Sequence, residues 1–170
     1  VTGSQDPLGL RRTAYGLIDV ILTLNLRIDL GWVLSEAVRP FGNEDLKKKV
    51  LSFLMERFEN YLEERRGVRY DVVDAVIGSG VMDLVNLEKR AIVLKELMEK
   101  EPELFEKVVV GQKRVANILE GVDELPPLDV NLFEKEEENI LYEVTRAEEP
   151  VVKKLVVKED FKDALEHLMN

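Results

Sequence analysis

The most regular part of the sequence is residues 43–67, which read NEDLKKKVLSFLMERFENYLEERRG. Apolar side chains recur there at intervals of three and four residues, at Leu46, Val50, Phe53, Leu54, Phe58, Tyr61 and Leu62. Asn43 is a favoured residue for capping the N-terminus of a helix, and Gly67 favours a stop at the other end. The stretch therefore predicts one long helix with a buried face.

Helical spacing continues before this stretch, and the alternation typical of strands is almost absent from the whole chain, so we predict an all-α protein. A first helix is expected to open at Asp6-Pro7 and to end near Asp29. A short second helix should stop before Arg39-Pro40, because the residue before a proline is pushed out of the helical region. Residues 40–43, Pro-Phe-Gly-Asn, are the strongest linker candidate, and we place a domain boundary between residues 42 and 43.

Helical spacing also continues after Gly67. A short helix is expected over residues 70–77, closed by Gly78-Ser79-Gly80, and Asp83 should cap a helix with the inward stripe Leu84, Leu87, Ala91, Leu94 and Leu97. The next helix should run from Pro102 to Gly121, with an inward side made of Phe105, Val108, Val115, Ile118 and Leu119.

The last third of the chain begins with a proline-containing surface loop at residues 123–127. Two helices split near Pro150 are expected to fill residues 134–158. A final helix should start at Asp160, with Phe161, Leu165 and Leu168 facing inward.

The charge of the chain is unevenly distributed. The 170 residues carry a formal net charge of −10, which argues against a general nucleic-acid binder because contact with phosphates depends on Lys and Arg. Residues 1–90 have a net charge of only −1, however, and residues 91–170 have −9. A basic surface in the first half is therefore compatible with an acidic, solvated second half.

Composition also narrows the class of protein. The chain has no cysteine, which excludes disulfides and thiolate chemistry and allows a reducing compartment. The longest apolar stretch, residues 17–26, is too short and too polar to span a bilayer. The N-terminal residues 1–4 contain neither an initiator Met nor the basic start of a signal peptide. We expect an excised fragment of a cytoplasmic protein that does not contact a membrane.

Few side chains offer the chemistry of an active site. His167 is the only histidine and has no evident ligand or triad partners, so we interpret it as a solvated surface imidazole. Gly78-Ser79-Gly80 lacks the Lys-Ser/Thr ending of a phosphate loop and is interpreted as a turn. A carboxylate cluster suits a helix N-terminus better than a calcium loop; it consists of Glu134, Glu136, Glu137 and Glu138. We predict no catalytic residue, metal site or cofactor in this chain.

Three groups of basic residues remain as candidates for binding. They are Arg11 with Arg12; Lys47, Lys48 and Lys49 with Arg65, Arg66 and Arg69; and Lys113 with Arg114 beside Asn117. Each group can serve simply to keep a helix solvated. The last group differs because its two cations and its amide fall within one helical turn, while Val115 and Ile118 are expected to face inward. Such an arrangement suits cation contacts to phosphate and amide contacts to a base edge.

Four stretches resemble the β subunit of bacterial-type heterotetrameric glycyl-tRNA synthetase. They are TGSQDPLGLRR (2–12), YDVVDAV (70–76), KRVANIL (113–119) and FKDAL (161–165). The first resembles a TGSxDPxxLRR motif at the end of a helical HD-like domain. The second and third resemble the YDxIDAV and KRVxNIL motifs of a helical anticodon-binding domain related to that of arginyl-tRNA synthetase. Within the second motif we interpret Asp71 and Asp74 as capping and helix-terminus residues rather than as ligands.

The resemblance implies a domain organisation and a function. Residues 1–42 would be the C-terminal helices of the HD-like domain, and residues 43–170 the anticodon-binding domain, truncated at its C-terminus. The chain would hold glycine tRNA for ATP-dependent aminoacylation by an α subunit in an α2β2 assembly, with ATP and Mg²⁺ used by the whole enzyme and not by this part. The implied tRNA-binding residues are Lys113, Arg114 and Asn117, together with Arg11 and Arg12, although arginines of an HD-like helix pair can equally bind carboxylates or helix ends.

Parts of the sequence also suggest two other functions. The acidic charge and the amphipathic helix from Asn43 also suit a helical protein-interaction module with no role in RNA binding. A remnant of an HD-type phosphohydrolase is the second alternative, but a single histidine does not supply the ligands that metal-dependent catalysis requires.

Overall fold

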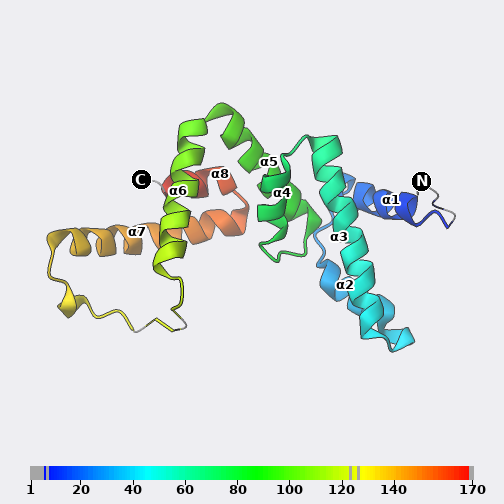
Figure 1. Cartoon of the computed structure of the whole chain (residues 1–170), viewed down its shortest axis with the longest axis horizontal. Helices are drawn as coiled ribbons and strands as arrows, with labels where there is room; N and C mark the ends of the chain where they lie inside the picture. The colour runs from blue at the N-terminus through cyan, green and yellow to red at the C-terminus, as the bar shows by residue number, and fades with distance from the viewer. Residues whose placement is uncertain (1–5, 7, 123, 126, 169–170) are drawn as a thin grey trace. The chain divides into compact units, whose positions relative to one another are not determined.

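The computed structural model describes residues 6, 8–122, 124–125 and 127–168, and all regular structure in this part of the chain is helical. The prediction of an all-α protein is therefore confirmed (Figure 1). The helices are α1 (Leu10–Thr23), α2 (Leu30–Val38), α3 (Glu44–Arg66), α4 (Tyr70–Ile77), α5 (Leu84–Lys100), α6 (Pro102–Ile118), α7 (Glu136–Lys158) and α8 (Phe161–His167), with 3-10 turns η1 (Arg39–Phe41) and η2 (Val130–Leu132).

The chain divides into two compact units, Val1–Lys95 and Glu96–Asn170, and each is described by itself. In the first unit α1, α2 and α4 pack against α3. The packing of α1 and α2 on α3 crosses the boundary that we placed between residues 42 and 43. That boundary concerns family domains and stays a prediction, because the compact units divide at another position.

Helix α3, cyan in Figure 1, organises the first unit as its sequence predicts. The Asn43 side chain accepts a hydrogen bond of 3.1 Å from the Leu46 N–H, and Gly67 ends the helix in the left-handed conformation with φ of 63°. Leu54, Phe58, Tyr61 and Leu62 are buried. Burying such apolar side chains stabilises a fold by roughly 1.5–3 kcal/mol each, so this stripe holds the unit together.

The ends of α1 differ from the prediction. The helix begins at Leu10, and the Asp6 carboxylate accepts a hydrogen bond of 3.1 Å from the Arg11 N–H. Residues 2–5 and Pro7 of the first motif lie outside the described residues. It ends at Thr23 because Asn25 adopts a left-handed φ of 52° and the Leu26 N–H bonds to the Ile21 carbonyl at 2.9 Å.

The predicted end at Asp29 was wrong. Asp29 instead caps α2, since its side chain accepts from the Trp32 N–H at 2.8 Å. This second helix stops at Val38, immediately before Arg39-Pro40, as predicted.

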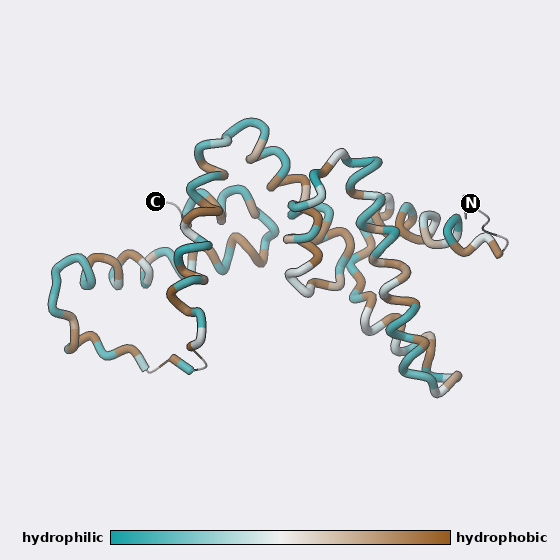
Figure 2. Tube along the Cα trace, in the orientation of Figure 1, coloured by the Kyte–Doolittle hydropathy of each residue, from teal (hydrophilic) through white to brown (hydrophobic). Residues whose placement is uncertain are grey.

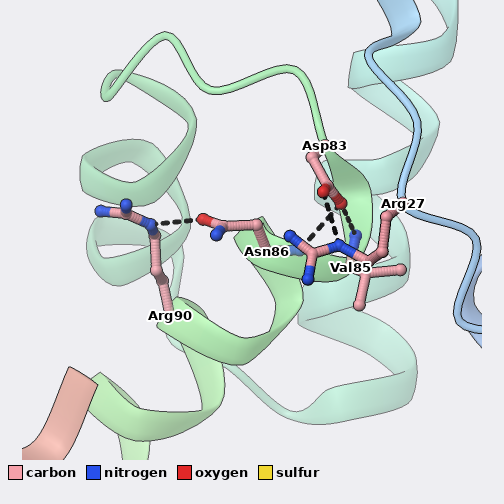
Figure 3. Close-up of polar contacts among 5 residues, drawn as sticks. All are labelled: Arg27, Asp83, Val85, Asn86 and Arg90. Atoms are coloured by element: carbon pink, nitrogen blue, oxygen red, sulfur yellow. Dashed lines mark hydrogen bonds and ion pairs between the residues drawn. The ribbon is translucent and has the colours of Figure 1, made fainter. Parts of the chain in front are cut away.

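Asp83 caps α5 as predicted and also fixes the connection between α1 and α2 (Figure 3). Its Oδ1 accepts from the backbone N–H groups of Val85 and Asn86 at 3.0 and 3.1 Å, and its Oδ2 lies 2.7 Å from Arg27 Nε. One turn later, Arg90 Nε donates to Asn86 Oδ1 at 2.6 Å. The start of α5 is therefore bonded both to its own helix and to the preceding connection.

The second unit has less buried apolar surface than the sequence suggests. None of the residues of α6 is buried, and Val115, Ile118 and Leu119, which we expected to face inward, are 52%, 76% and 42% exposed. Figure 2 shows apolar residues along the tube in both α6 and α7. The spacing predicted the helix correctly, and Phe105 and Val108 on its predicted inward side are half-buried, but the apolar residues at its far end are exposed.

Helices α7 and α8 also correct two predictions. Residues 136–158 form one helix with Pro150 inside it, and not two helices. Pro150 lacks an N–H, so one helical hydrogen bond is missing there, yet the helix continues on both sides. In α8, Phe161 and Ala164 are buried as the inward side, whereas Leu168 is 64% exposed. Residues 123 and 126 of the predicted loop lie outside the described residues.

Candidate nucleic-acid interface

The last turns of α6 present two cations and an amide to solvent. Lys113, Arg114 and Asn117 are all exposed on this helix. Within the described part of the chain, no hydrogen bond or ion pair engages the side chains of these three residues. The structure therefore brings them together on one exposed helix end, as predicted, but the apolar residues beside them are exposed as well.

Arg11 and Arg12 lie in the first turn of α1, and both side chains are exposed. Their backbone N–H groups donate to the Asp6 carboxylate at 3.1 and 3.4 Å, which satisfies the start of the helix. These arginines belong to the first unit and the α6 group to the second, so we consider them as separate surfaces.

The arginines at the end of α3 are already bound to carboxylates. Arg65 Nη1 lies 2.9 Å from Asp19 of α1, and Arg66 Nε lies 2.6 Å from Glu88 of α5. The Arg65 guanidinium also lies over the rings of Tyr15 and Tyr61, with its carbon 5.1 and 5.3 Å from the ring centroids. These contacts join three helices, and a phosphate would have to compete with the carboxylates for each arginine.

Two groups near the end of α3 have shifted pKa values. Arg69 donates to both oxygens of Asp71, at 2.6 and 2.5 Å, and these bonds lower the pKa of the Asp71 carboxyl. Burial raises the pKa of the Tyr61 hydroxyl. Asp71 lies in the first turn of α4 and accepts from the Val72 N–H, in agreement with its interpretation as a helix-terminus residue. Asp74 lies in the interior of the same helix, so its interpretation as a helix-terminus residue was wrong.

The acidic cluster forms the N-terminus of α7, as predicted. Glu138 accepts hydrogen bonds from the backbone N–H groups of Lys135 and Glu134, at 2.9 and 2.8 Å, and these bonds lower the pKa of its carboxyl. Among the described residues, no group of three or more His, Cys, Asp or Glu side chains is arranged to hold a metal ion. The cluster caps a helix and keeps it solvated.

His167 is not the free surface imidazole that we expected. Its Nδ1 lies 2.6 Å from Glu148 Oε2, and the contact is partly buried. Lys162, at the start of the same helix, lies 2.7 Å from Glu101 at the start of α6. Both contacts join residues far apart in the sequence, so local spacing gave no signal for them.

Gly78-Ser79-Gly80 forms the turn that the sequence predicts, since Gly80 has a left-handed φ of 73° and α4 ends at Ile77. Across the described residues, no helix is both long and apolar enough to cross a membrane.

Comparison with known proteins gives one consistent result. The family described as glycyl-tRNA synthetase beta subunit matches residues 1–78. The glycine–tRNA ligase β subunit of Halothermothrix orenii is 32% identical over 99% of this chain and 25% of its own length. The corresponding proteins of Halalkalibacterium halodurans and Aromatoleum aromaticum are 36% and 35% identical, over 84% and 96% of this chain. The chain spans 21–24% of the length of these last two relatives, about a quarter.

Proposed function

Because this chain belongs to the glycyl-tRNA synthetase β-subunit family, we propose that it is a tRNA-recognition portion of a glycine–tRNA ligase, in which the exposed end of α6 contacts glycine tRNA. The complete enzyme would join glycine to tRNA at the expense of ATP, with Mg²⁺, at an α-subunit site within an α2β2 assembly. This chain would supply no catalytic group to that reaction.

The observation that carries this proposal is the state of Lys113 and Arg114. Both are exposed, neighbouring and without a carboxylate partner among the described residues, in contrast to Arg65, Arg66 and Arg69. Unpaired cations can contact RNA phosphates without first breaking an ion pair, and Asn117 beside them can bond to a base edge. Arg11 and Arg12 are a second proposed contact in the other unit.

The domain assignment is part of the same proposal. Residues 1–42 would come from the end of an HD-like domain, and residues 43–170 from a helical anticodon-binding domain of the arginyl-tRNA synthetase type. The binding energy of tRNA on this surface would help to place the acceptor end at the active site. Its contribution to catalysis is therefore positioning, and no proton or group is transferred here.

A helical protein-interaction module is the competing function, and one observation favours it. Ile118 of α6 and Leu141 of α7 are 76% and 68% exposed, in a unit with a strong acidic excess. Large exposed apolar surfaces often mark protein contacts. The two functions differ in their dependence on Arg114.

The test is the Arg114→Ala substitution in the complete β subunit, assembled as the active ligase. Loss of a charge-assisted contact should raise the KM for tRNA about tenfold, while adenylate formation from glycine and ATP stays unchanged. Arg146→Ala on α7 is the matched control, because it removes the same charge from another exposed helix of the same unit. Unchanged tRNA kinetics in Arg114→Ala would contradict the proposal.

A further inference from the structure

The direction of α6 is not fixed by a buried face. None of its 17 residues is buried, so apolar packing contributes little to where its far end lies. At 1.5 Å per residue, Arg114 lies about 20 Å along the helix from Glu101. A small rotation at the start of α6 therefore moves the exposed cations by several ångströms.

One ion pair holds the start of this helix. Lys162 Nζ of α8 lies 2.7 Å from Glu101 Oε1, and Glu166 lies 3.6 Å from the same Nζ. Glu101 occupies the N-cap position of α6, yet its side chain does not bond to the helix. The carboxylate is instead directed to Lys162, and the bond to Glu101 is the main cause of a raised pKa of the Lys162 amine.

Helix α8 is itself firmly placed. Phe161 and Ala164 are buried, and α8 packs closely against α7. The bond of 2.6 Å between His167 Nδ1 and Glu148 Oε2 ties the other end of α8 to α7. This short helix thus has a polar contact at each end, one to α7 and one to the corner between α5 and α6.

We propose that Lys162 and Glu101 are positioning residues for tRNA binding, and that their ion pair sets the direction of α6 and thereby the place of Lys113 and Arg114. This role rests on the proposed function of α6. Neither residue contacts the RNA in this account. Both act through the helix that they hold.

The size of the effect on folding is expected to be small. The side chains of Lys162 and Glu101 are 54% and 37% exposed, and exposed ion pairs contribute little to stability. The effect on binding is larger than the effect on stability because RNA contact requires several groups to meet the phosphates at once. The test therefore measures tRNA affinity and uses melting temperature as a check of folding.

Charge reversal separates positioning from general electrostatics. Lys162→Glu makes the chain more acidic and Glu101→Lys makes it more basic, so simple attraction to RNA would weaken in the first and strengthen in the second. A positioning role predicts instead that each single substitution weakens tRNA binding, and that the variant carrying both substitutions binds tRNA normally again. Lys153→Glu is the matched control, because Lys153 also pairs with a glutamate, Glu149 at 2.5 Å, but within α7 and without contact to Glu101 or Lys162 in that ion pair.

The dissociation constant for glycine tRNA is measured with the assembled ligase over a salt series. We expect each single reversal at the corner to weaken binding about three- to fivefold and the double reversal to return within about twofold of the starting value. The control should change affinity by less than about twofold. Glu101→Gln and Lys162→Gln serve as milder variants if a reversal lowers the melting temperature.

The possible results distinguish this inference from the function on which it rests. Tighter binding by Glu101→Lys, or no recovery in the double reversal, overturns the positioning role alone if Arg114→Ala still weakens binding. No effect of Arg114→Ala overturns the proposed function and the positioning role with it.

Discussion

At the scale of single residues, the role of a charged side chain depends on the partner that folding gives it. Arg65 is bonded to Asp19 and lies over two tyrosine rings, whereas Lys113 and Arg114 meet no carboxylate among the described residues. All three are cationic side chains in the sequence. The first stabilises contacts between helices, and the others remain available to a ligand.

Glu59 shows the opposite situation, a carboxylate among carboxylates. Burial, and then the charges of Asp74, Glu56 and Glu63, raise its pKa above the ordinary value of 4.5. The ionised form of Glu59 is therefore disfavoured in the folded state. Ionisation lowers the free energy of unfolding as the pH rises from about 4.5 through the folded-state pKa.

Glu59→Gln should accordingly stabilise the chain at pH 7, by less than about 1 kcal/mol because the side chain is only partly buried, and should have no effect near pH 3. Urea unfolding at the two pH values measures the difference. Glu64→Gln, an exposed position on the same helix, is the control. Destabilisation by Glu59→Gln at pH 7, or an equal gain at both pH values, would show that the carboxylate carries no such penalty.

Residues with local partners were predictable from the sequence. Asn43, Gly67 and Asp83 cap helices as expected, because their partners lie within a few residues. Asp29 was assigned to the wrong helix because the left-handed Asn25, which ends α1, was overlooked as a stop signal. The bonds of His167 and Lys162 depend on tertiary structure, and no local pattern indicates them.

At the scale of elements, the sequence predicts where a helix lies better than what covers it. Residues 102–118 have an apolar stripe, and they form the expected helix α6. Periodicity identifies an apolar side but does not show whether a partner is present within the chain. Pro150 also shows the limit of a local rule. It removes one hydrogen bond from the long helix α7, and the helix continues through it.

Two glycines should respond in opposite directions to the same substitution. Gly67 has a left-handed φ of 63°, and an added Cβ would lie 3.2 Å from the Lys95 amine that caps α3 through the Arg66 carbonyl. Gly67→Ala should destabilise the first unit by about 1–2 kcal/mol. Gly16 lies inside α1 with no atom within 4 Å of an added Cβ, so Gly16→Ala should stabilise it by about 0.5–1 kcal/mol.

Thermal or urea unfolding of both variants measures these changes. Circular dichroism before unfolding serves to confirm that helix content is unaltered. Equal effects of the two substitutions would contradict the assigned backbone conformation at Gly67.

At the scale of the whole molecule, the two units differ in the size of their cores. Of the buried apolar residues in the described part of the chain, only Leu97, Phe161 and Ala164 belong to the second unit. The first unit contains the fully buried Phe58, Ile18 and Leu62. Since burial of apolar surface is the main stabilising contribution, the two units should not unfold as one.

Hydrogen exchange detected by mass spectrometry should reveal this difference. Amides of α3 and α4 are expected to exchange at least about tenfold more slowly than those of α6 and the first half of α7. Uniform protection along the whole chain would show that the second unit is stabilised as strongly as the first.

The most direct test of the central claim is the binding of glycine tRNA to this chain, measured by anisotropy at about 50 and about 200 mM salt beside an unrelated tRNA. The account predicts binding that prefers glycine tRNA, weakens as salt rises, and is largely lost when Lys113 and Arg114 are both replaced by Ala. Absence of binding at either salt concentration, or binding that ignores both substitutions, would contradict it.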